Sequence, residues 1–336
     1  MHLGLLAPPW CSVPPPAYGG TEQVVHLLAE GLAAAGVEVS LFATGDSKAP
    51  DRLGYCFDEP PRPMGLGTLE AAHALAGYRY FHEVGVNVVH DHTSLGPLLA
   101  PPGRRIAVTN HGPFGPSETE VLRRAAEHAA IVAISRCQAA MGEAAGVPIE
   151  AVIHHGIDVA SVPTGPGDGG YALFLGRMAA VKGAADAIAI ARAAGMPLVL
   201  AGKCADPEEV EYFDRMIRPE LGADVEWRGE VGPDEKHQLL GDAAALINPI
   251  SWPEPFGLVM AEALACGTPV VTTPCGAAPE IVDDGVTGFV RDRSELATAL
   301  ARVGEIDRGA CRAAAVARFS VDRMVEQHLR LYEHLV

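Results

Sequence analysis

Two carboxylates, Glu254 and Glu262, bracket the start of a predicted helix late in the sequence. Glu254 lies in a loop that Pro253 and Pro255 keep out of helical conformation, and Glu262 lies about one turn inside the helix that begins near Leu258. A helix N-terminus offers unpaired backbone N–H groups and a positive dipole end, which suit a phosphate, while carboxylates bind hydroxyl groups. Phosphate and hydroxyl groups together describe a nucleotide sugar, although two glutamates alone also fit a solvated helix face.

A second group of candidates lies in the turn from Gly176 to Gly183, which follows a predicted strand and opens a predicted helix. Glycine at both ends lets the backbone approach a diphosphate, and Arg177 and Lys182 supply positive charge. The alternative is a surface loop with two solvated cations. If the turn binds a diphosphate, these side chains stabilise the charge that a leaving phosphate gains when a bond to it breaks.

The candidates in the first half of the sequence are less specific. The loop Tyr18–Glu22 contains two glycines that allow close approach to a phosphate or sugar, and its alternative is a plain capped turn. His111 ends a predicted strand at the expected ligand-binding edge, where a structural histidine is the alternative. In His90-Asp91-His92, two histidines with a spacing of two point the same way on a strand. No third ligand is evident, so the sequence does not predict a metal site.

The string from Pro253 to Val271 reads Pro-Glu-Pro-Phe-Gly-Leu and then Glu-Ala-Leu-Ala-Cys-Gly-Thr-Pro-Val-Val. It resembles the donor-site signature of the retaining GT-B glycosyltransferases of family 4. The Gly-Arg…Lys-Gly turn, the Gly-Gly-x-Glu loop and Gly156-Ile157-Asp158 are similar to other elements of that family. His154-His155 departs from the Pro-Asn that the family more often has before this glycine. The resemblance covers nearly the whole chain and is most specific in the second half.

The resemblance implies roles for the matched residues. Glu254 contacts the sugar hydroxyls, Glu262 contacts the ribose, and backbone amides near Gly257 face the sugar and diphosphate. The full set of implied donor-binding residues is Gly19, Gly20, Arg177, Lys182, Glu254, Phe256, Gly257, Leu258 and Glu262.

The implied catalytic set combines three of these donor-binding residues with a histidine that faces the transferring sugar: His111, Arg177, Lys182 and Glu254. Glu22 and Asp91 are placed on the acceptor side. Because no Asp-x-Asp dyad marks a metal site, we expect no metal and no cofactor beyond the nucleotide-diphosphate sugar, which is a substrate.

These residues need a scaffold, and the sequence supplies apolar strand runs that alternate with helices. Such alternation predicts doubly wound parallel sheets, which bind ligands at the carboxyl ends of their strands. The predicted strands span 3–7, 37–43, 86–89, 106–109, 131–134, 171–175, 197–201, 225–227, 245–248 and 270–273. The predicted class is α/β and, by resemblance, GT-B, with two Rossmann-like domains facing a central cleft.

The composition changes most clearly at residues 162–170, which are rich in glycine and proline and indicate a linker. We therefore expect an acceptor-binding domain at 1–160 and a donor-binding domain at 161–319. The resemblance adds that a last helix, 320–336, crosses back to the first domain. Residues 44–67 are predicted to form a long loop that walls the acceptor site, and Thr21 is predicted to cap the helix after the first strand.

Composition limits the partners and the compartment. The 336 residues carry a net charge of −17, which opposes nucleic acid and anionic membranes. Seven cysteines without Cys-x-x-Cys spacing suit a reducing cytoplasm. The apolar start of the sequence ends at Pro8-Pro9 and is predicted to be a buried strand rather than a signal peptide.

The residues and the resemblance together predict a cytoplasmic, metal-independent glycosyltransferase that uses a nucleotide-diphosphate sugar. The resemblance implies retention of configuration and front-face attack. Residues 1–158 carry nine Lys and Arg against sixteen Asp and Glu, so we expect no stable membrane association and a small soluble acceptor, neutral or cationic. A nucleotide-sugar epimerase of similar shape and a non-catalytic nucleotide-sugar binder are the alternatives. A nicotinamide oxidoreductase lacks the expected glycine fingerprint. The base, the sugar, the acceptor, the linkage and the oligomeric state are not indicated.

Overall fold

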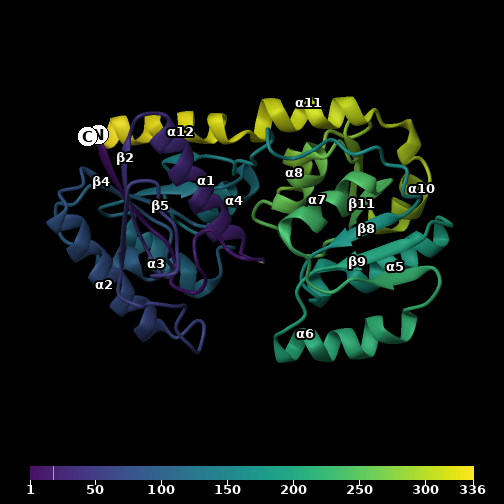
Figure 1. Cartoon of the computed structure of the whole chain (residues 1–336), viewed down its shortest axis with the longest axis horizontal. Helices are drawn as coiled ribbons and strands as arrows, with labels where there is room; N and C mark the ends of the chain where they lie inside the picture. Colours follow the sequence, from purple (N-terminus) through teal and green to yellow (C-terminus); the bar gives the residue numbers. More distant parts are fainter. Residues whose placement is uncertain (18) are drawn as a thin grey trace. The chain divides into compact units, whose positions relative to one another are not determined.

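The computed structural model describes residues 1–17 and 19–336 (Figure 1). The chain divides into two compact units. The first unit comprises Met1–Gly156 and Val321–Val336, and the second comprises Ile157–Ser320. In each unit helices cover a parallel β-sheet, which confirms the predicted α/β class (Figure 1).

In the described part of the first unit, seven strands form a sheet in the order β3-β2-β1-β4-β5-β6-β7. Neighbouring strands are parallel throughout. The strands β1 and β5 are buried because they consist mainly of Leu, Ile, Val and Ala, as expected for strands covered on both faces. The strands are β1 His2–Leu6, β2 Glu38–Ala43, β3 Arg52–Tyr55, β4 Val88–Asp91, β5 Ile106–Thr109, β6 Ala130–Ala133 and β7 Ala151–Val152.

Helices cover this sheet on both sides, with α1 and α12 on one and α2 and α3 on the other (Figure 1). The core under α2 and α3 includes Phe42, Tyr78, Phe81 and Ile106, each at most 2% exposed. Burying a side chain such as Phe81 contributes about 1.5–3 kcal/mol. The helices are α1 Gly20–Ala34, α2 Gly67–Glu83, the 3-10 turn η1 Gly96–Leu99, α3 Pro116–Ala125, α4 Arg136–Ala144 and α12 Val321–Leu335.

The second unit repeats the principle with a sheet in the order β10-β9-β8-β11-β12-β13. All neighbouring strands are again parallel, so their carboxyl ends share one edge. β12 reads Val-Val-Thr, a β-branched run that favours strand. The strands are β8 Ala172–Leu175, β9 Leu198–Ala201, β10 Val225–Trp227, β11 Ala245–Asn248, β12 Val270–Thr272 and β13 Gly288–Val290.

Figure 1 shows α7, α8 and α11 on one side of the second sheet and α5 and α6 on the other. The α-helices are α5 Ala184–Ala193, α6 Pro207–Tyr212, α7 Pro233–Asp242, α8 Leu258–Ala265, α9 Ala278–Ile281, α10 Leu296–Leu300 and α11 Arg308–Phe319. Shorter turns are η2 Ala180–Lys182, the π-helical turn η3 Phe213–Ile217, η4 Arg218–Glu220, η5 Arg293–Glu295 and η6 Val303–Glu305.

Three sequence-based expectations about local structure are wrong. Residues 44–67 are not all loop, because β3 pairs with β2 as an edge strand; its four residues, with an internal glycine, are too short and mixed to signal a strand. Thr21 does not cap α1, which begins at Gly20 after Gly19 and has no side-chain cap.

The third concerns residues 162–170, which lie inside the second unit rather than linking the units. The backbone N–H groups of Gly165, Gly167 and Gly169 donate to carbonyl oxygens of Cys266, Gly241 and Asp242. Glycine is required at 165 because a Cβ there would lie 2.2 Å from the Gly241 backbone. The glycine content therefore reflects close backbone packing, and the boundary between the units falls earlier, after Gly156.

Candidate functional site

The turn between β8 and α5 presents Arg177 and Lys182 beyond the carboxyl ends of the second sheet. This edge is where open α/β sheets bind ligands. Gly183 closes the turn with φ of 84°, and a Cβ there would lie 2.5 Å from the carbonyl oxygen of Pro249. Only glycine fits this position, so the turn packs directly on the loop that follows β11.

Lys182 forms an ion pair with Glu254, which lies in that same loop. The two side chains are only 18% and 14% exposed. The indole Nε1 of Trp252 donates to the same carboxylate oxygen at 2.9 Å, and the Lys182 ammonium lies 4.9 Å from the Trp252 ring centroid. The sequence-based prediction omitted Trp252, although its position two residues before Glu254 is a signal that was available.

The backbone of Glu254 is held by the segment before α9. The N–H of Ala277 donates to the carbonyl oxygen of Glu254 at 2.9 Å. Gly276 has φ of 58°, and a Cβ there would lie 2.3 Å from the backbone nitrogen and oxygen of Glu254. The carboxylate therefore projects from a loop that is fixed on both sides.

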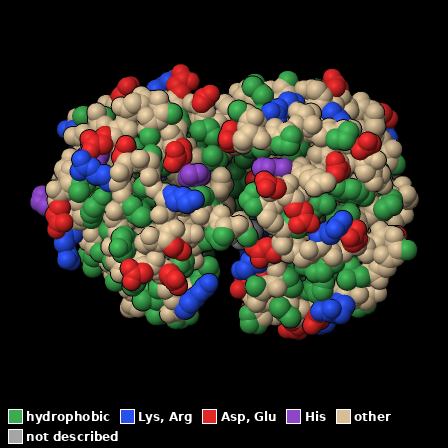
Figure 2. All heavy atoms as spheres, in the orientation of Figure 1, with side chains coloured by type: hydrophobic (Ala, Val, Ile, Leu, Met, Phe, Trp, Pro, Cys, Tyr) green, Lys and Arg blue, Asp and Glu red, His purple; other side chains and the backbone are tan. Residues whose placement is uncertain are grey.

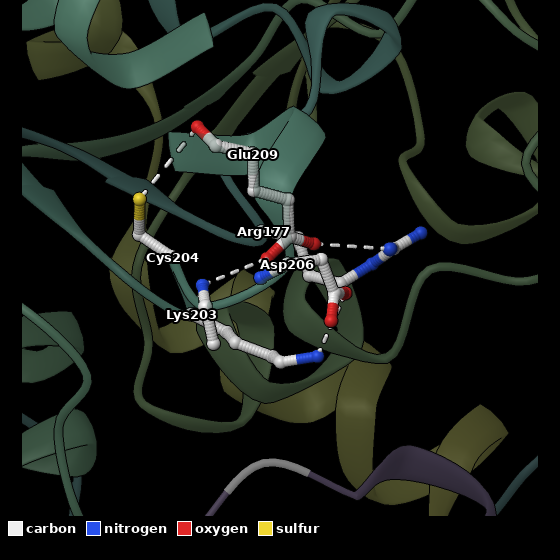
Figure 3. A network of polar contacts seen from close by, with 6 residues as sticks. Arg177, Lys203, Cys204, Asp206 and Glu209 are labelled. Atoms are coloured by element: carbon white, nitrogen blue, oxygen red, sulfur yellow. Dashed lines mark hydrogen bonds and ion pairs between the residues drawn. The ribbon is translucent and has the colours of Figure 1, made fainter. Parts of the chain in front are cut away.

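Arg177 has a different partner, the buried Glu209 of α6 (Figure 3). Arg177 Nη1 lies 3.1 Å from Glu209 Oε1, while Glu209 Oε2 accepts the N–H groups of Ala205 and Asp206 at 3.1 and 3.3 Å. Beside this network Lys203 Nζ lies 3.0 Å from Asp206 Oδ2. One carboxylate thus caps α6 and orients the guanidinium, which remains 37% exposed and available to an anion.

Glu262 pairs with Lys236 of α7 at 2.7 Å. The sequence shows Lys236 only as one polar residue of a helix, and the packing of α7 on α8 brings it to Glu262. The side chains are 25% and 14% exposed for Lys236 and Glu262. A further cation therefore lies at this edge of the sheet, beside the carboxylate predicted to contact the ribose.

The N-terminus of α8 lies between the two predicted carboxylates. Leu258 is its first residue and follows Gly257, whose φ is 98°. Phe256 is buried and packs edge-on against Phe319, with ring centroids 5.9 Å apart. The N–H of Met260 donates to the carbonyl oxygen of Gly257 at 3.0 Å, whereas the N–H groups of Leu258 and Val259 have no acceptor within the helix. This end therefore carries free donors and the positive end of the dipole.

In the first unit Gly19, Gly20 and Glu22 lie at the start of α1, whereas Tyr18 lies outside the described residues. Glu22 is 7% exposed, and burial raises its pKa. A Cβ on Gly19 would lie 3.2 Å from a Glu22 carboxylate oxygen, so this carboxyl group turns back toward the glycine loop. The loop therefore holds a buried acid directly beside the glycines predicted to approach the donor.

His111 belongs to a cluster of five histidines, named here the histidine cluster, in the described part of the first unit. Successive ring centroids are 4.1 to 5.2 Å apart. The members are His90 in β4, His92 just after β4, His111 just after β5, His155 after β7 and His328 in α12. His111 is half-buried and the others are buried.

Hydrogen bonds fix most of these rings. His90 bonds Tyr332 Oη at 2.6 Å and Thr109 Oγ1 at 2.7 Å, and His92 Nδ1 lies 2.9 Å from His111 Nε2. In the last contact one ring nitrogen donates and the other accepts. Among the residues that the structure describes, His92 Nε2 has no hydrogen-bond partner although it is buried.

Burial keeps the histidine cluster neutral at pH 7. It lowers the pKa of His111 to about 3 and that of His328 to about 4, and it holds the pKa of His90, His92 and His155 well below the ordinary value. A neutral imidazole both donates and accepts hydrogen bonds. This edge of the first unit therefore offers polar but uncharged groups.

Asp91 is not positioned as the sequence suggested. Its side chain is fully buried and accepts hydrogen bonds from Tyr78 Oη at 2.6 Å, Thr93 N at 2.8 Å and Thr93 Oγ1 at 2.7 Å. Burial raises its pKa to about 6. Because no part of the side chain is exposed, the geometry favours a structural role in holding the segment after β4 over contact with an acceptor.

The described residues, 1–17 and 19–336, contain no group of three or more His, Cys, Asp or Glu side chains arranged to hold a metal ion. Among the same residues, none of the helices is both long enough and apolar enough to cross a membrane.

Two family models match the chain in succession. The model described as Glycosyltransferase Family 4 matches residues 18–161, and the model described as Glycosyl transferases group 1 matches residues 169–305. Among curated proteins, the chain is similar to alpha-maltose-1-phosphate synthase of Mycobacterium tuberculosis (strain CDC 1551 / Oshkosh), with 32% identity over 157 residues, covering 41% of this chain and 40% of that protein. The chain spans less than half the length of the curated relatives it matches.

Solved structures match over the full length. AviGT4, a glycosyltransferase involved in avilamycin A biosynthesis, is 30% identical with a TM-score of 0.75, covering 100% of this chain and 98% of that chain. Anabaena HepE, solved in complex with UDP and glucose, is 21% identical with a TM-score of 0.78, covering 99% of this chain and 100% of that chain, a likeness that shows the fold. The chain therefore belongs to the family 4 glycosyltransferases and has the GT-B fold.

Proposed function

We propose that this protein transfers a sugar, with retention of anomeric configuration, from a nucleotide-diphosphate sugar to a small soluble acceptor, without a metal ion. The observation that carries the proposal is the arrangement around α8. The free N–H groups of this helix lie between Glu254, paired with Lys182, and Glu262, paired with Lys236. Phosphate suits the helix end and the cations, and hydroxyl groups suit the carboxylates.

Support for the donor class comes from solved relatives of the same fold. HepE has been solved with UDP, with UDP and glucose, and with UDP-glucose. In this chain the corresponding chemistry is assigned to the second unit. Arg177 and Lys182 bind the diphosphate, Glu254 binds the sugar hydroxyls, and Glu262 binds the ribose.

In the proposed step, the bond between the anomeric carbon and the diphosphate oxygen breaks, and the acceptor oxygen or nitrogen forms its bond on the same face. The proton of the acceptor leaves toward the departing phosphate oxygen on that face. Negative charge builds on the diphosphate, and Arg177, Lys182 and the start of α8 stabilise it. These fixed cations take the place that a divalent ion has in other transferases.

His111 is proposed to contact the transferring sugar from the first unit, and Glu22 to lie on the acceptor side. Three features support a neutral or cationic acceptor: the neutral histidine cluster, the buried acid Glu22 and the excess of acids in residues 1–158. The same excess opposes docking on anionic lipid. Figure 2 shows Asp and Glu side chains interspersed with Lys and Arg on the face drawn.

A thermal-shift screen over nucleotide-diphosphate sugars tests the donor, since a ligand that binds only the native state raises its stability. The stabilising donor is then incubated with a panel of sugars, aminocyclitols and lipid-linked acceptors, with and without EDTA. We expect product from a soluble acceptor, retention in the NMR coupling of the anomeric proton, and nearly unchanged rates with EDTA. An isomerised donor without transfer indicates an epimerase, and binding without any turnover indicates a binder. An inverted product excludes the mechanism.

A further inference from the structure

A groove of about 810 Å³ opens on the first unit, on a part of the surface that the proposed transfer reaction does not use. Its walls are the C-terminal half of α2, the two residues directly before β4, Leu99 of η1 and the Pro101–Arg105 segment before β5. A volume of this size falls within the range of small-molecule sites. The residues lining it include Arg79, His82, Arg104 and Arg105 but no Asp or Glu within the described residues.

This concentration of positive charge is unusual for the unit. Residues 1–158 carry only nine Lys and Arg against sixteen acids, and three of the nine line the groove. Arg123 and Arg124 on α3 are each paired, with Glu120 of the same helix and with Glu127 just after its end. Arg79 and Arg105, by contrast, are exposed and have no carboxylate within 4.0 Å in the described chain. Two guanidinium groups are therefore free to bind an anion.

The third arginine is held in place. Arg104 Nη1 donates to the carbonyl oxygen of Val86 at 2.9 Å, and the side chain is half-buried. This bond uses one N–H of five, so the remaining fork stays oriented beside the groove. An oriented guanidinium binds phosphate with two parallel hydrogen bonds and loses less entropy in doing so than a mobile one.

The rest of the lining is apolar. Leu75 is 50% exposed at the groove, and Val86, Leu99, Pro101 and Pro102 complete its walls. A lone inorganic anion would leave this surface uncovered, whereas an organic phosphate with an apolar or aromatic body covers it. The arginines and the apolar walls together indicate an organic phosphate as the ligand class.

The groove lies at the opposite edge of the sheet from the histidine cluster. Asn87 precedes β4 and Arg105 precedes β5, whereas His92 and His111 follow those strands. Because β4 and β5 are parallel, their starts share one edge and their ends share the other. The groove is therefore separate from the residues assigned to sugar transfer.

We propose that this groove is a second ligand site, which binds an organic phosphate through Arg79, Arg104 and Arg105 and covers the ligand body with Leu75 and the two prolines. The phosphate belongs either to a free metabolite or to a phospholipid headgroup. Both share the same recognition chemistry, and the experiment separates them.

The test uses the full chain, titrated calorimetrically with adenosine 5′-monophosphate and with inorganic pyrophosphate. The groove variant carries Arg79→Glu and Arg105→Glu, and the charge-matched control carries Arg123→Glu and Arg124→Glu. A donor-site variant, Arg177→Ala with Lys182→Ala, removes binding to the other phosphate site. Circular dichroism and melting temperature check that each variant is folded; the groove arginines are exposed, so we expect no loss of structure.

In the donor-site variant we expect adenosine 5′-monophosphate still to bind. Adding the groove substitutions should weaken its affinity at least tenfold, and adding the control substitutions should change its affinity less than threefold. Vesicles of phosphatidylglycerol and phosphatidylcholine form the second arm, and vesicle binding lost only in the groove variant identifies a lipid source. Equal binding by groove and control variants overturns the proposal, as does the absence of any binding in the donor-site background. If the donor-site substitutions leave wild-type binding unchanged, the donor assignment fails while the groove stands.

Discussion

The two units place different chemistry at the carboxyl ends of similar parallel sheets. In the second unit this edge carries cation–carboxylate pairs that include Arg177–Glu209, Lys182–Glu254 and Lys236–Glu262. In the first unit it carries the histidine cluster, whose rings are neutral because burial depresses every pKa. The side chains of the ion pairs in the second unit are charged, whereas the imidazoles of the histidine cluster in the first unit are neutral.

In the function proposed above, the charged edge serves the donor and the neutral edge serves the transferring sugar. The ion pairs of the second unit keep cations and carboxylates oriented toward the groups that they are proposed to bind. Buried imidazoles cannot hold charge but present fixed donors and acceptors. We therefore expect changes at the ion pairs of the second unit to affect binding of the charged donor, and changes in the histidine cluster to affect transfer at nearly constant donor affinity.

The largest effect should come from the donor cations. Arg177→Ala and Lys182→Ala should each lower turnover about 10²-fold or more, the scale for losing one preorganised charge-stabilising group. The measurement is product formation at saturating donor. Arg215→Ala is the control, because this exposed arginine pairs with Glu211 one turn away on the surface. Wild-type turnover in either donor variant would remove the site assignment.

A smaller effect is expected at the first unit. His111→Ala removes a hydrogen-bonding group from the proposed sugar contact and should lower turnover about 10- to 100-fold, the equivalent of about 1.5–3 kcal/mol. Donor affinity, measured by calorimetry, should change less than threefold. His334→Ala is the matched control, since that ring is exposed near the end of α12. A large loss of donor affinity in His111→Ala would break the proposed division between the units.

The neutral histidines also predict acid sensitivity of the first unit. Their pKa values in the folded chain lie below the ordinary value of about 6.5, so from pH 6.5 downward the unfolded chain binds protons that the folded chain does not. Stability is then lost as pH falls from about 6.5 toward 4, by at most about 1.4 kcal/mol per pH unit for each such histidine. Asp91, with its pKa raised to about 6, has the opposite sign, as do Glu22 and Glu70, whose pKa values burial also raises, so these three acids offset part of the loss.

Hydrogen exchange at pH 7 and pH 5 measures this in each unit separately. The first unit should lose protection at pH 5 before the second. His328→Gln, which removes one buried titrating ring, should reduce the pH dependence of the first unit only. Equal loss of protection in both units would show that the histidine cluster does not control acid stability.

The smallest effect is expected at Glu209, which positions Arg177 without touching the donor in our assignment. Glu209→Gln keeps an oxygen for the N–H groups that begin α6 but removes the charge that orients the guanidinium. We expect turnover to fall about 3- to 10-fold with melting temperature nearly unchanged, and Glu209→Asp to fall between wild type and Gln. Loss of stability without loss of turnover at saturating donor would show that Glu209 is purely structural.

The sequence by itself determined the fold class and most of the second unit. The strands 225–227 and 245–248 were predicted with the bounds that β10 and β11 have, and the helix after Gly257 begins where expected. Strong local signals explain this success, because β-branched runs, prolines and glycine stops act over a few residues. The family was confirmed on the same residues, since its motifs are contiguous in the sequence.

Only the tertiary structure determined which side chains from distant parts of the sequence contact one another. Lys236 meets Glu262 only because α7 packs on α8, and Glu209 reaches Arg177 from 32 residues away. His328 and Tyr332 join His90 from α12, 242 residues along the chain in the case of Tyr332. No local pattern marks these pairs, because a single His, Lys or Glu on a helix is equally compatible with solvent. Burial then sets the chemistry, leaving the histidines uncharged and Asp91 inside the unit, since the cost of desolvating a charge depends on the folded environment and not on the residue type.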